Sequence, residues 1–280
     1  MASPISRRAL AAAATAILLG LSGCSSGGQS ASVTPPPASG TGTLRIGVAT
    51  DEPGVSLKEG SSYSGFDIET ATYVAAALDV PAQNITWVPI EKADRESALE
   101  SGEVNLVVDT FTITPERQQR VDFAGPYFVA HQDLLIRRND VSITGPESLD
   151  GKTLCSVTGT TSAAYVRDNY RGRITLREVP TYSECVRNLV AGDVDAVSTD
   201  DLILAGFAAQ PDYKGVLKVV GNGFTDERYG IGVRKGDTAT VQKVNDALTQ
   251  YIDSGAWRAA LDKTVAPSGY AIPDPPAVGS

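Results

Sequence analysis

The sequence predicts an α/β fold in which one strand–helix pattern is built twice. Residues 44–48 alternate as in a β-strand, and Ala71, Val74, Ala75 and Leu78 then recur at helical spacing. The same order of strands and helices begins again after residue 150. Because alternating strands and helices are typical of helices that cover a mainly parallel sheet, the whole pattern indicates an α/β class.

The remaining elements follow in order along the chain. Residues 104–108 form a short apolar run, as expected for a buried parallel strand. In the second half, strands are predicted near residues 153–157, 174–179 and 194–197, and helices near 162–170 and 183–191.

An internal repeat supports two similar halves. Residues 99–107 match residues 189–197 at a constant offset of 90, and each copy reads as a helix end, a glycine and a strand. The alternative is a chance likeness between two helix–glycine–strand units. If the repeat is real, its strands direct residues 109–117 and 199–201 toward a common cleft, because ligands bind beyond the carboxyl ends of strands in open α/β sheets.

The N-terminal segment predicts export and a lipid anchor. Arg7 and Arg8 precede an apolar stretch, residues 9–21, which has the order of a secretory signal and is too short to span a bilayer. The stretch ends in Leu21-Ser-Gly-Cys24, which resembles a bacterial lipobox. Residues 1–23 are therefore expected to be a lipoprotein signal peptide and Cys24 to be lipidated, with a plain signal peptide as the alternative. The arginine pair also fits a twin-arginine signal, so both export routes stay open.

Residues 24–42 are nearly all small or polar, which predicts a flexible tether between the anchor and a folded domain. The net charge of −9 becomes −11 once Arg7 and Arg8 are removed. This charge argues against nucleic acid as a partner and against a polybasic contact with anionic lipid. Attachment to the membrane is thus expected to come from Cys24.

Two further cysteines, Cys155 and Cys185, are expected to form a disulfide, because an exported protein meets oxidising conditions. In the chain-entropy model a closed loop of about 30 residues adds roughly 3–4 kcal/mol of stability. Two buried free thiols are the alternative. With one histidine and no CxxC pair, neither a metal site nor a cofactor is expected.

Seven short motifs stand in order between residues 43 and 265: Leu44–Asp51, Gly65–Glu69, Thr112–Arg117, Val121–Tyr127, Gly159–Ser162, Val194–Asp200 and Tyr229–Val233. In this order and spacing they resemble the bacterial extracellular solute-binding proteins of family 3, the polar amino-acid receptors of ABC importers. The actinobacterial glutamate-binding branch is the most similar.

The resemblance implies a two-lobed periplasmic-binding-protein fold of type II, hinged by two crossover strands that let the lobes close on a ligand. Lobe 1 would comprise residues 43–126 and 230–280, lobe 2 residues 131–224, and the hinges would lie near 127–131 and 225–229. It also implies a monomer that binds an amino acid and delivers it to an ABC permease. Glutamate is the first expectation, followed by aspartate, glutamine and asparagine.

The resemblance assigns the ligand's α-carboxylate to Arg117, whose planar fork can hold a carboxylate through two hydrogen bonds, with help from Thr112. The backbone amides at Thr160 and Thr161 would contribute from the start of a helix. The alternatives are a surface arginine and a threonine that caps only its own helix.

The resemblance assigns the α-ammonium to Asp200 and to the carbonyl of Thr110, with Asp201 as the alternative to Asp200. Arg95 aligns with an arginine that acidic-amino-acid receptors use near the distal carboxylate, and Lys92 stands three residues earlier. A solvated helix surface is the alternative for both. Residues 51–55 lack the aromatic that many members place over the ligand, which favours a short charged ligand.

Two other functions use the same fold. A periplasmic dehydratase acting on cyclohexadienyl acids would need a general acid and a cavity for a ring. A sensor that reports occupancy to a membrane kinase would share the binding site and differ in its partner. His131 is expected to be structural, because no nucleophile motif accompanies it.

Overall fold

A computed structural model describes residues 40–170 and 172–279 of the chain. The predicted signal peptide, the predicted lipidation site Cys24 and most of the predicted tether lie outside these residues. Residues 40–42, the end of the predicted tether, contact the folded domain. The Gly40 amide donates to Asp79 Oδ1 (3.1 Å), and Asn84 Nδ2 donates to the Gly42 carbonyl (3.0 Å). The end of the predicted tether thus lies against the folded domain.

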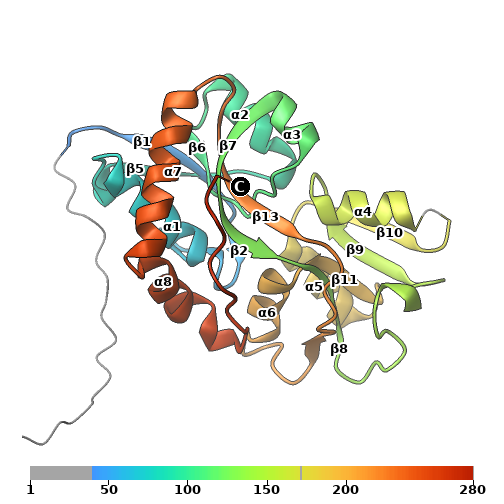
Figure 1. Cartoon of the computed structure of the whole chain (residues 1–280). Helices are drawn as coiled ribbons and strands as arrows, with labels where there is room; N and C mark the ends of the chain where they lie inside the picture. Colours follow the sequence, from blue (N-terminus) through green and yellow to red (C-terminus); the bar gives the residue numbers. More distant parts are fainter. Residues whose placement is uncertain (1–39, 171, 280) are drawn as a thin grey trace, which may run out of the picture. The chain divides into compact units, whose positions relative to one another are not determined.

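Lobe 1 is built on a five-stranded mixed sheet in the order β5-β1-β6-β13-β7 (Figure 1). β1 pairs in parallel with β5 and β6, and β13 is antiparallel to β6 and β7. A small antiparallel sheet, β2-β3-β4, follows β1. The bounds are β1 Leu44–Val48, β2 Asp51–Glu52, β3 Ser56–Glu59, β4 Ser62–Ser64, β5 Ile85–Pro89, β6 Leu106–Val107, β7 Val121–Ala130 and β13 Glu227–Arg234.

Helices cover both faces of this sheet, which buries the strands between two layers. Ile46 and Val48 of β1 belong to the apolar cluster that includes α1, α7 and α8, whereas Val107 of β6 packs with Ala98 and Leu99 of α2. The bounds are α1 Phe66–Ala77, α2 Arg95–Ser101, α3 Pro115–Arg120, α7 Thr238–Asp253 and α8 Ala256–Thr264, with 3-10 turns η1 Ala82–Asn84, η2 Lys92–Asp94 and η4 Ala266–Ser268.

Lobe 2 is built on a second five-stranded sheet in the order β10-β9-β11-β8-β12. Cys155 on β9 and Cys185 on α5 form the predicted disulfide and are fully buried, so it fastens a helix to the sheet within this lobe. The bounds are β8 Gln132–Arg137, β9 Thr153–Val157, β10 Thr175–Val179, β11 Ala196–Asp200, β12 Leu217–Val219, α4 Thr161–Asn169, α5 Tyr182–Ala191, α6 Asp201–Ala208 and η3 Pro146–Ser148.

The chain passes between the two sheets twice. β7 belongs to the first sheet and β8 to the second, with His131 between them, and the return passes from β12 to β13. His131 lies at both passages, because its Nδ1 is 2.9 Å from the Thr225 carbonyl and 3.1 Å from Asp226 Oδ1. The predicted hinge segments lie at these places, and their motion stays a prediction.

The internal repeat corresponds to equivalent structure. α2 ends at Gly102 and α5 ends at Gly192, and both glycines adopt the left-handed conformation that ends a helix (φ 76° and 87°). β6 and β11 follow, but each strand begins later along the chain than predicted. The reason in the first copy is that the Val104 amide still bonds to the Ala98 carbonyl in the helix-ending turn.

Within residues 40–170 and 172–279, no helix is both long and apolar enough to cross a bilayer.

Candidate functional site

The predicted ligand residues all line one small cavity to which both lobes contribute. The lining residues are Lys92, Arg95, Thr110, Thr112, Arg117, Thr160, Thr161, Ser162, Tyr182 and Asp200. The cavity volume is about 10 Å³, which is room for one water molecule. The structure is therefore a closed form, and the lobes must separate before an amino acid can enter.

Arg117 stands in the first turn of α3, where the local sequence places it. Thr114 caps this helix by accepting from the Arg117 amide (3.2 Å), and Pro115 occupies the first helical position, which suits its fixed φ. The side chain turns inward: Nη1 donates to the Thr112 carbonyl (2.7 Å), and Nε lies 3.5 Å from Glu96 Oε1. Arg117 is thus a cleft residue rather than a surface arginine.

Arg95 is also buried, at 2 % exposure, which excludes the solvated-helix alternative. Its guanidinium donates to the carbonyls of Lys92 (2.9 Å) and Asp109 (3.0 Å). In the described part of the chain no carboxylate pairs with it. Both guanidinium groups lie over the ring of Phe111, at 4.4 Å for Arg95 and 4.9 Å for Arg117.

The two arginines meet at one carbonyl oxygen from the other lobe. Arg95 Nη2 (3.1 Å) and Arg117 Nη2 (3.0 Å) both donate to the carbonyl of Gly159. Burial and the neighbouring Arg95 lower the pKa of Arg117 to about 9. Two cations therefore converge on one carbonyl oxygen, which makes this point of the cleft favourable for a negatively charged group.

Asp200 places one carboxyl group on the lobe 2 side of the same cavity. It ends β11 and is 4 % exposed. Its carboxylate accepts from the Tyr229 hydroxyl (2.5 Å) and lies 3.5 Å from Ser162 Oγ. Burial and, second, the charge of Glu227 raise the pKa of Asp200 to about 8. A cation in the cavity would relieve both effects.

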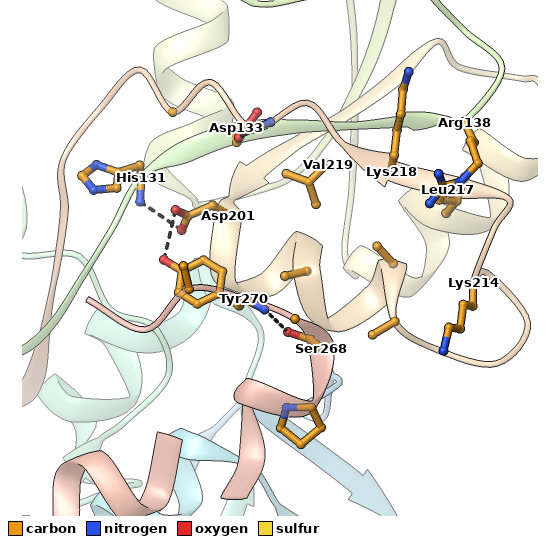
Figure 2. A pocket seen from close by; sticks show the side chains of 18 of the residues that line it. His131, Asp133, Arg138, Asp201, Lys214, Leu217, Lys218, Val219, Ser268 and Tyr270 are labelled. Atoms are coloured by element: carbon orange, nitrogen blue, oxygen red, sulfur yellow. Dashed lines mark hydrogen bonds between the residues drawn. The ribbon is translucent and has the colours of Figure 1, made fainter. Parts of the chain in front are cut away.

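Asp201 lies on a different side of β11's end from Asp200. It lines a separate cavity of about 830 Å³, shown in Figure 2, together with His131, Tyr270 and residues of β12. There Asp201 accepts from the His131 amide (3.2 Å) and the Tyr270 hydroxyl (3.0 Å). None of the predicted ligand residues lines this larger cavity, so the structure separates the two neighbouring aspartates.

Lys92 lines the cleft, but its ammonium group is already paired. Its Nζ lies 2.7 Å from Glu52 Oε1 and 2.5 Å from Asp109 Oδ1, and it donates to Thr110 Oγ1 (2.8 Å). All these groups are buried. Burial raises the pKa of Glu52 to about 8 despite Lys92. Lys92 belongs to η2 and Arg95 begins α2 directly after it, and both side chains line the cavity.

The start of α4 faces the arginines. Thr160 caps the helix by accepting from the Ala163 amide (3.0 Å), so the capping interpretation holds. The amides of Thr161 and Ser162 come next and have no acceptor within the helix, as in any first turn. Capping and anion binding are therefore compatible here. Thr161 also donates to Glu227 Oε2 (2.8 Å).

Sequence reasoning missed three participants. Tyr182 and Ser162 line the cavity, and Phe111 lies beneath both arginines. The Tyr182 hydroxyl accepts from Thr199 (2.6 Å). Ser162 stood inside a noted motif, but nothing in the sequence distinguished Tyr182 or Phe111 from core aromatics.

Comparison with known families decides which class of protein this chain belongs to. The profile of the bacterial extracellular solute-binding proteins, family 3, matches residues 44–266. The chain belongs to this family. The expected family and the two-lobed α/β fold are thereby confirmed, and the chain is a solute-binding protein rather than an enzyme.

Relatives in the solute-binding family support the same conclusion. The glutamate-binding protein GluB of Corynebacterium efficiens is 39% identical over 80% of this chain and 79% of its own length. The glutamine-binding protein GlnH of Bacillus subtilis, an ABC transporter component, is 33% identical over 76% and 77%. Among solved structures, an ancestral arginine-binding protein bound to arginine is 32% identical with a TM-score of 0.74, covering 80% of this chain and 98% of that one.

Proposed function

We propose that this protein is the extracytoplasmic substrate-binding lipoprotein of an ABC importer and that its substrate is L-glutamate. The observation that supports this proposal most directly is the arrangement of charged groups in the closed cleft. Arg95 and Arg117 converge on one point, and Asp200 lines the same cavity. Two cations and one anion are the complement of an amino acid with two carboxylates and one ammonium group.

In the proposed arrangement Arg117 binds the α-carboxylate, and the amides of Thr161 and Ser162 assist from lobe 2. Asp200 and the Thr110 carbonyl bind the ammonium group. Arg95 binds the distal carboxylate. When the lobes open, the arginines lose the Gly159 carbonyl, and carboxylate oxygens then replace it as acceptors.

This arrangement also predicts selectivity. Glutamine offers no distal charge to Arg95, and a basic amino acid brings a cation toward it, so both should bind less tightly than glutamate. The name of the Corynebacterium relative supports glutamate, while the name of the Bacillus relative makes glutamine a competitor to test.

The test is a thermal-shift screen of the ectodomain against the twenty amino acids after unfolding and refolding to remove retained ligand. A ligand that binds only the folded state raises the melting temperature by mass action. We expect the largest shift with glutamate, a smaller one with aspartate, and small shifts with the two amides. A largest shift with lysine, arginine or an apolar amino acid would overturn the glutamate proposal.

The anchor and the transport partner belong to the same proposal. Lipidation at Cys24 predicts metabolic labelling with a fatty acid that Cys24→Ala abolishes while the protein is still exported. An importer role predicts that deleting the gene lowers the uptake of labelled glutamate. Normal uptake with a changed response of a signalling pathway would instead favour the sensor.

A further inference from the structure

Thr110 has a backbone conformation that its side chain disfavours. Its φ is +43°, in the left-handed region that β-branched residues rarely adopt. Within residues 40–170 and 172–279 the one other non-glycine residue with positive φ is Asp79. Thr110 also lines the cavity, and its carbonyl is the proposed partner of the ligand's ammonium group. Such strain persists only where the surroundings hold it.

The main restraint is Asp67, the acidic residue of the Gly65–Glu69 motif. Asp67 is fully buried, and its Oδ2 accepts the Thr110 amide at 2.8 Å. Its other oxygen, Oδ1, accepts the Tyr127 hydroxyl at 2.7 Å. Lys92 adds a bond to the Thr110 hydroxyl. Both carboxylate oxygens of Asp67 thus accept hydrogen bonds from residues that are far away in the sequence.

A purely local role for Asp67 does not fit these contacts. An acidic residue in the first turn of a helix often caps that helix or balances its dipole. α1 begins at Phe66, yet no side chain caps its first turn, and both carboxylate oxygens point to the Thr110 loop and to β7. β7 is the strand that leads into lobe 2.

We propose that Asp67 is a positioning residue for ligand recognition. It holds Thr110 in the left-handed conformation and so sets the direction of the Thr110 carbonyl, which accepts from Arg95 Nη1 (3.5 Å) in this closed form and would bind the ligand's ammonium group. Its second bond ties the same loop to Tyr127, close to the first passage between the lobes. The inference rests on the proposed function, because the ammonium group belongs to the amino acid proposed above.

The test is a double-mutant cycle read by calorimetric titration with L-glutamate. Asp67→Leu keeps the approximate size and removes both acceptors. It should weaken binding about tenfold or more, the loss expected for a buried hydrogen bond that orients a binding group. In a Thr110→Gly background, where the left-handed conformation carries no side-chain strain, the same change should cost about threefold or less.

Asp67→Asn is the matched conservative variant. Its carboxamide oxygen can still accept the Thr110 amide, and its amino group can donate to the Tyr127 oxygen. It should therefore retain affinity to within about threefold of the wild type. Equal losses for Asp67→Leu in both backgrounds, or a loss with Asp67→Asn as large as with Asp67→Leu, would overturn the proposal in favour of a merely structural role.

Amide hydrogen exchange of the wild-type protein is a second test, and it requires neither a variant nor a ligand. In the wild-type protein the Thr110 amide should exchange with deuterated water at least about 100-fold more slowly than in an unfolded chain, because Asp67 occupies it. Exchange at the unfolded rate would overturn the positioning role even if the Asp67 variants fail to fold. If the wild type binds no amino acid while this amide is protected, the proposed function fails and the restraint on Thr110 stands.

Discussion

The guanidinium groups of Arg117 and Arg95 lie over the same Phe111 ring and donate to the same Gly159 carbonyl. We nevertheless assign them to different parts of the ligand. Arg117 lies at the start of α3 beside the Thr112 carbonyl. Arg95 lies at the start of α2 and contacts the carbonyl groups of Lys92 and Asp109. Every amino acid has an α-carboxylate, whereas a distal carboxylate is confined to the acidic ones, so the two arginines should differ in the ligands they affect.

We predict that Arg117→Ala abolishes the binding of every amino acid. Arg95→Ala should weaken glutamate and aspartate about 100-fold, the loss of a buried charge-assisted contact, while glutamine changes little. Calorimetric titration of each ligand measures both effects. Arg120→Ala is the matched control, because Arg120 lies on the same helix as Arg117 but is exposed and paired with Glu100. Equal losses for glutamate and glutamine in Arg95→Ala would contradict the selectivity assignment.

The position of these residues in the cleft could be predicted from the sequence, because the resemblance assigns charged side chains at strand and helix ends to the ligand. The residues with which they pair could not be predicted. Lys92 was expected near the ligand or on a solvated helix surface, but its ammonium group pairs with Glu52, which comes from the distant strand β2. The sequence assigned Asp200 to the ligand only through the resemblance and left Asp201 as the alternative, and in the structure Asp200 lines the cleft whereas Asp201 lines a separate cavity.

At the scale of elements, closure depends on close approach between α6 of lobe 2 and the loop after β2. A side-chain carbon added at Gly206 would lie 2.0 Å from the Pro53 carbonyl oxygen, which is too close for any real contact. Gly206 is inside α6, where alanine is otherwise favoured over glycine. A substitution at Gly206 should therefore impede closure of the lobes without lowering the stability of the fold.

Gly206→Ala should weaken glutamate binding about tenfold or more, because the closed form becomes crowded. Its ligand-free melting temperature should stay equal or rise, since alanine favours the helix by about 0.5–1 kcal/mol. Titration and thermal denaturation of one sample report the two effects. Unchanged affinity would mean that the loop yields and that this contact does not limit closure.

The disulfide is a second element-scale feature, internal to lobe 2. Replacing Cys155 and Cys185 together by alanine should lower the free energy of unfolding by about 2–5 kcal/mol. Glutamate affinity should change little, because neither cysteine lines the cleft. Urea denaturation with and without ligand measures both quantities. A stability loss below about 1 kcal/mol would show that core packing alone holds α5 on β9.

Several elements could be predicted, among them β1, β9, α4 and α5, because hydrophobic periodicity and the glycine stops at Gly102 and Gly192 are local signals. The boundaries of β6 and β11 were less accurate. A strand's first residue depends on the turn that precedes it, and in lobe 1 the Val104 amide is used in that turn. The order of strands in the two sheets was not predicted, because the pairing of distant strands leaves no local signal.

At the scale of the whole molecule, several buried carboxyl groups favour their protonated form. Burial is the first cause in each case and raises the pKa of Asp67 to about 7 and of Glu52 and Asp200 to about 8. In the unfolded chain these groups lose their protons near pH 4. Between about pH 4 and pH 8 the folded state therefore holds more protons than the unfolded state.

It follows that the ligand-free protein should lose stability as the pH rises from about 5 to 8. Each such group contributes about 1.4 kcal/mol per pH unit over which it stays protonated only in the folded state. Urea denaturation at pH 5 and pH 8 measures the slope. Asp67→Asn should reduce it, because Asp67 and its partners Thr110 and Tyr127 all lie in lobe 1, while the exposed control Asp262→Asn should not. Stability that rises steadily over this range would contradict the burial of uncompensated carboxyl groups.

The most direct test of the central claim is calorimetric titration of the ligand-stripped ectodomain with L-glutamate and with L-glutamine. The two ligands differ little in size but differ by the one charge assigned to Arg95. We predict that glutamate binds about 100-fold more tightly, as expected for one buried charge-assisted contact. Equal affinities, or a preference for glutamine, would contradict the assignment of the cleft to an acidic amino acid.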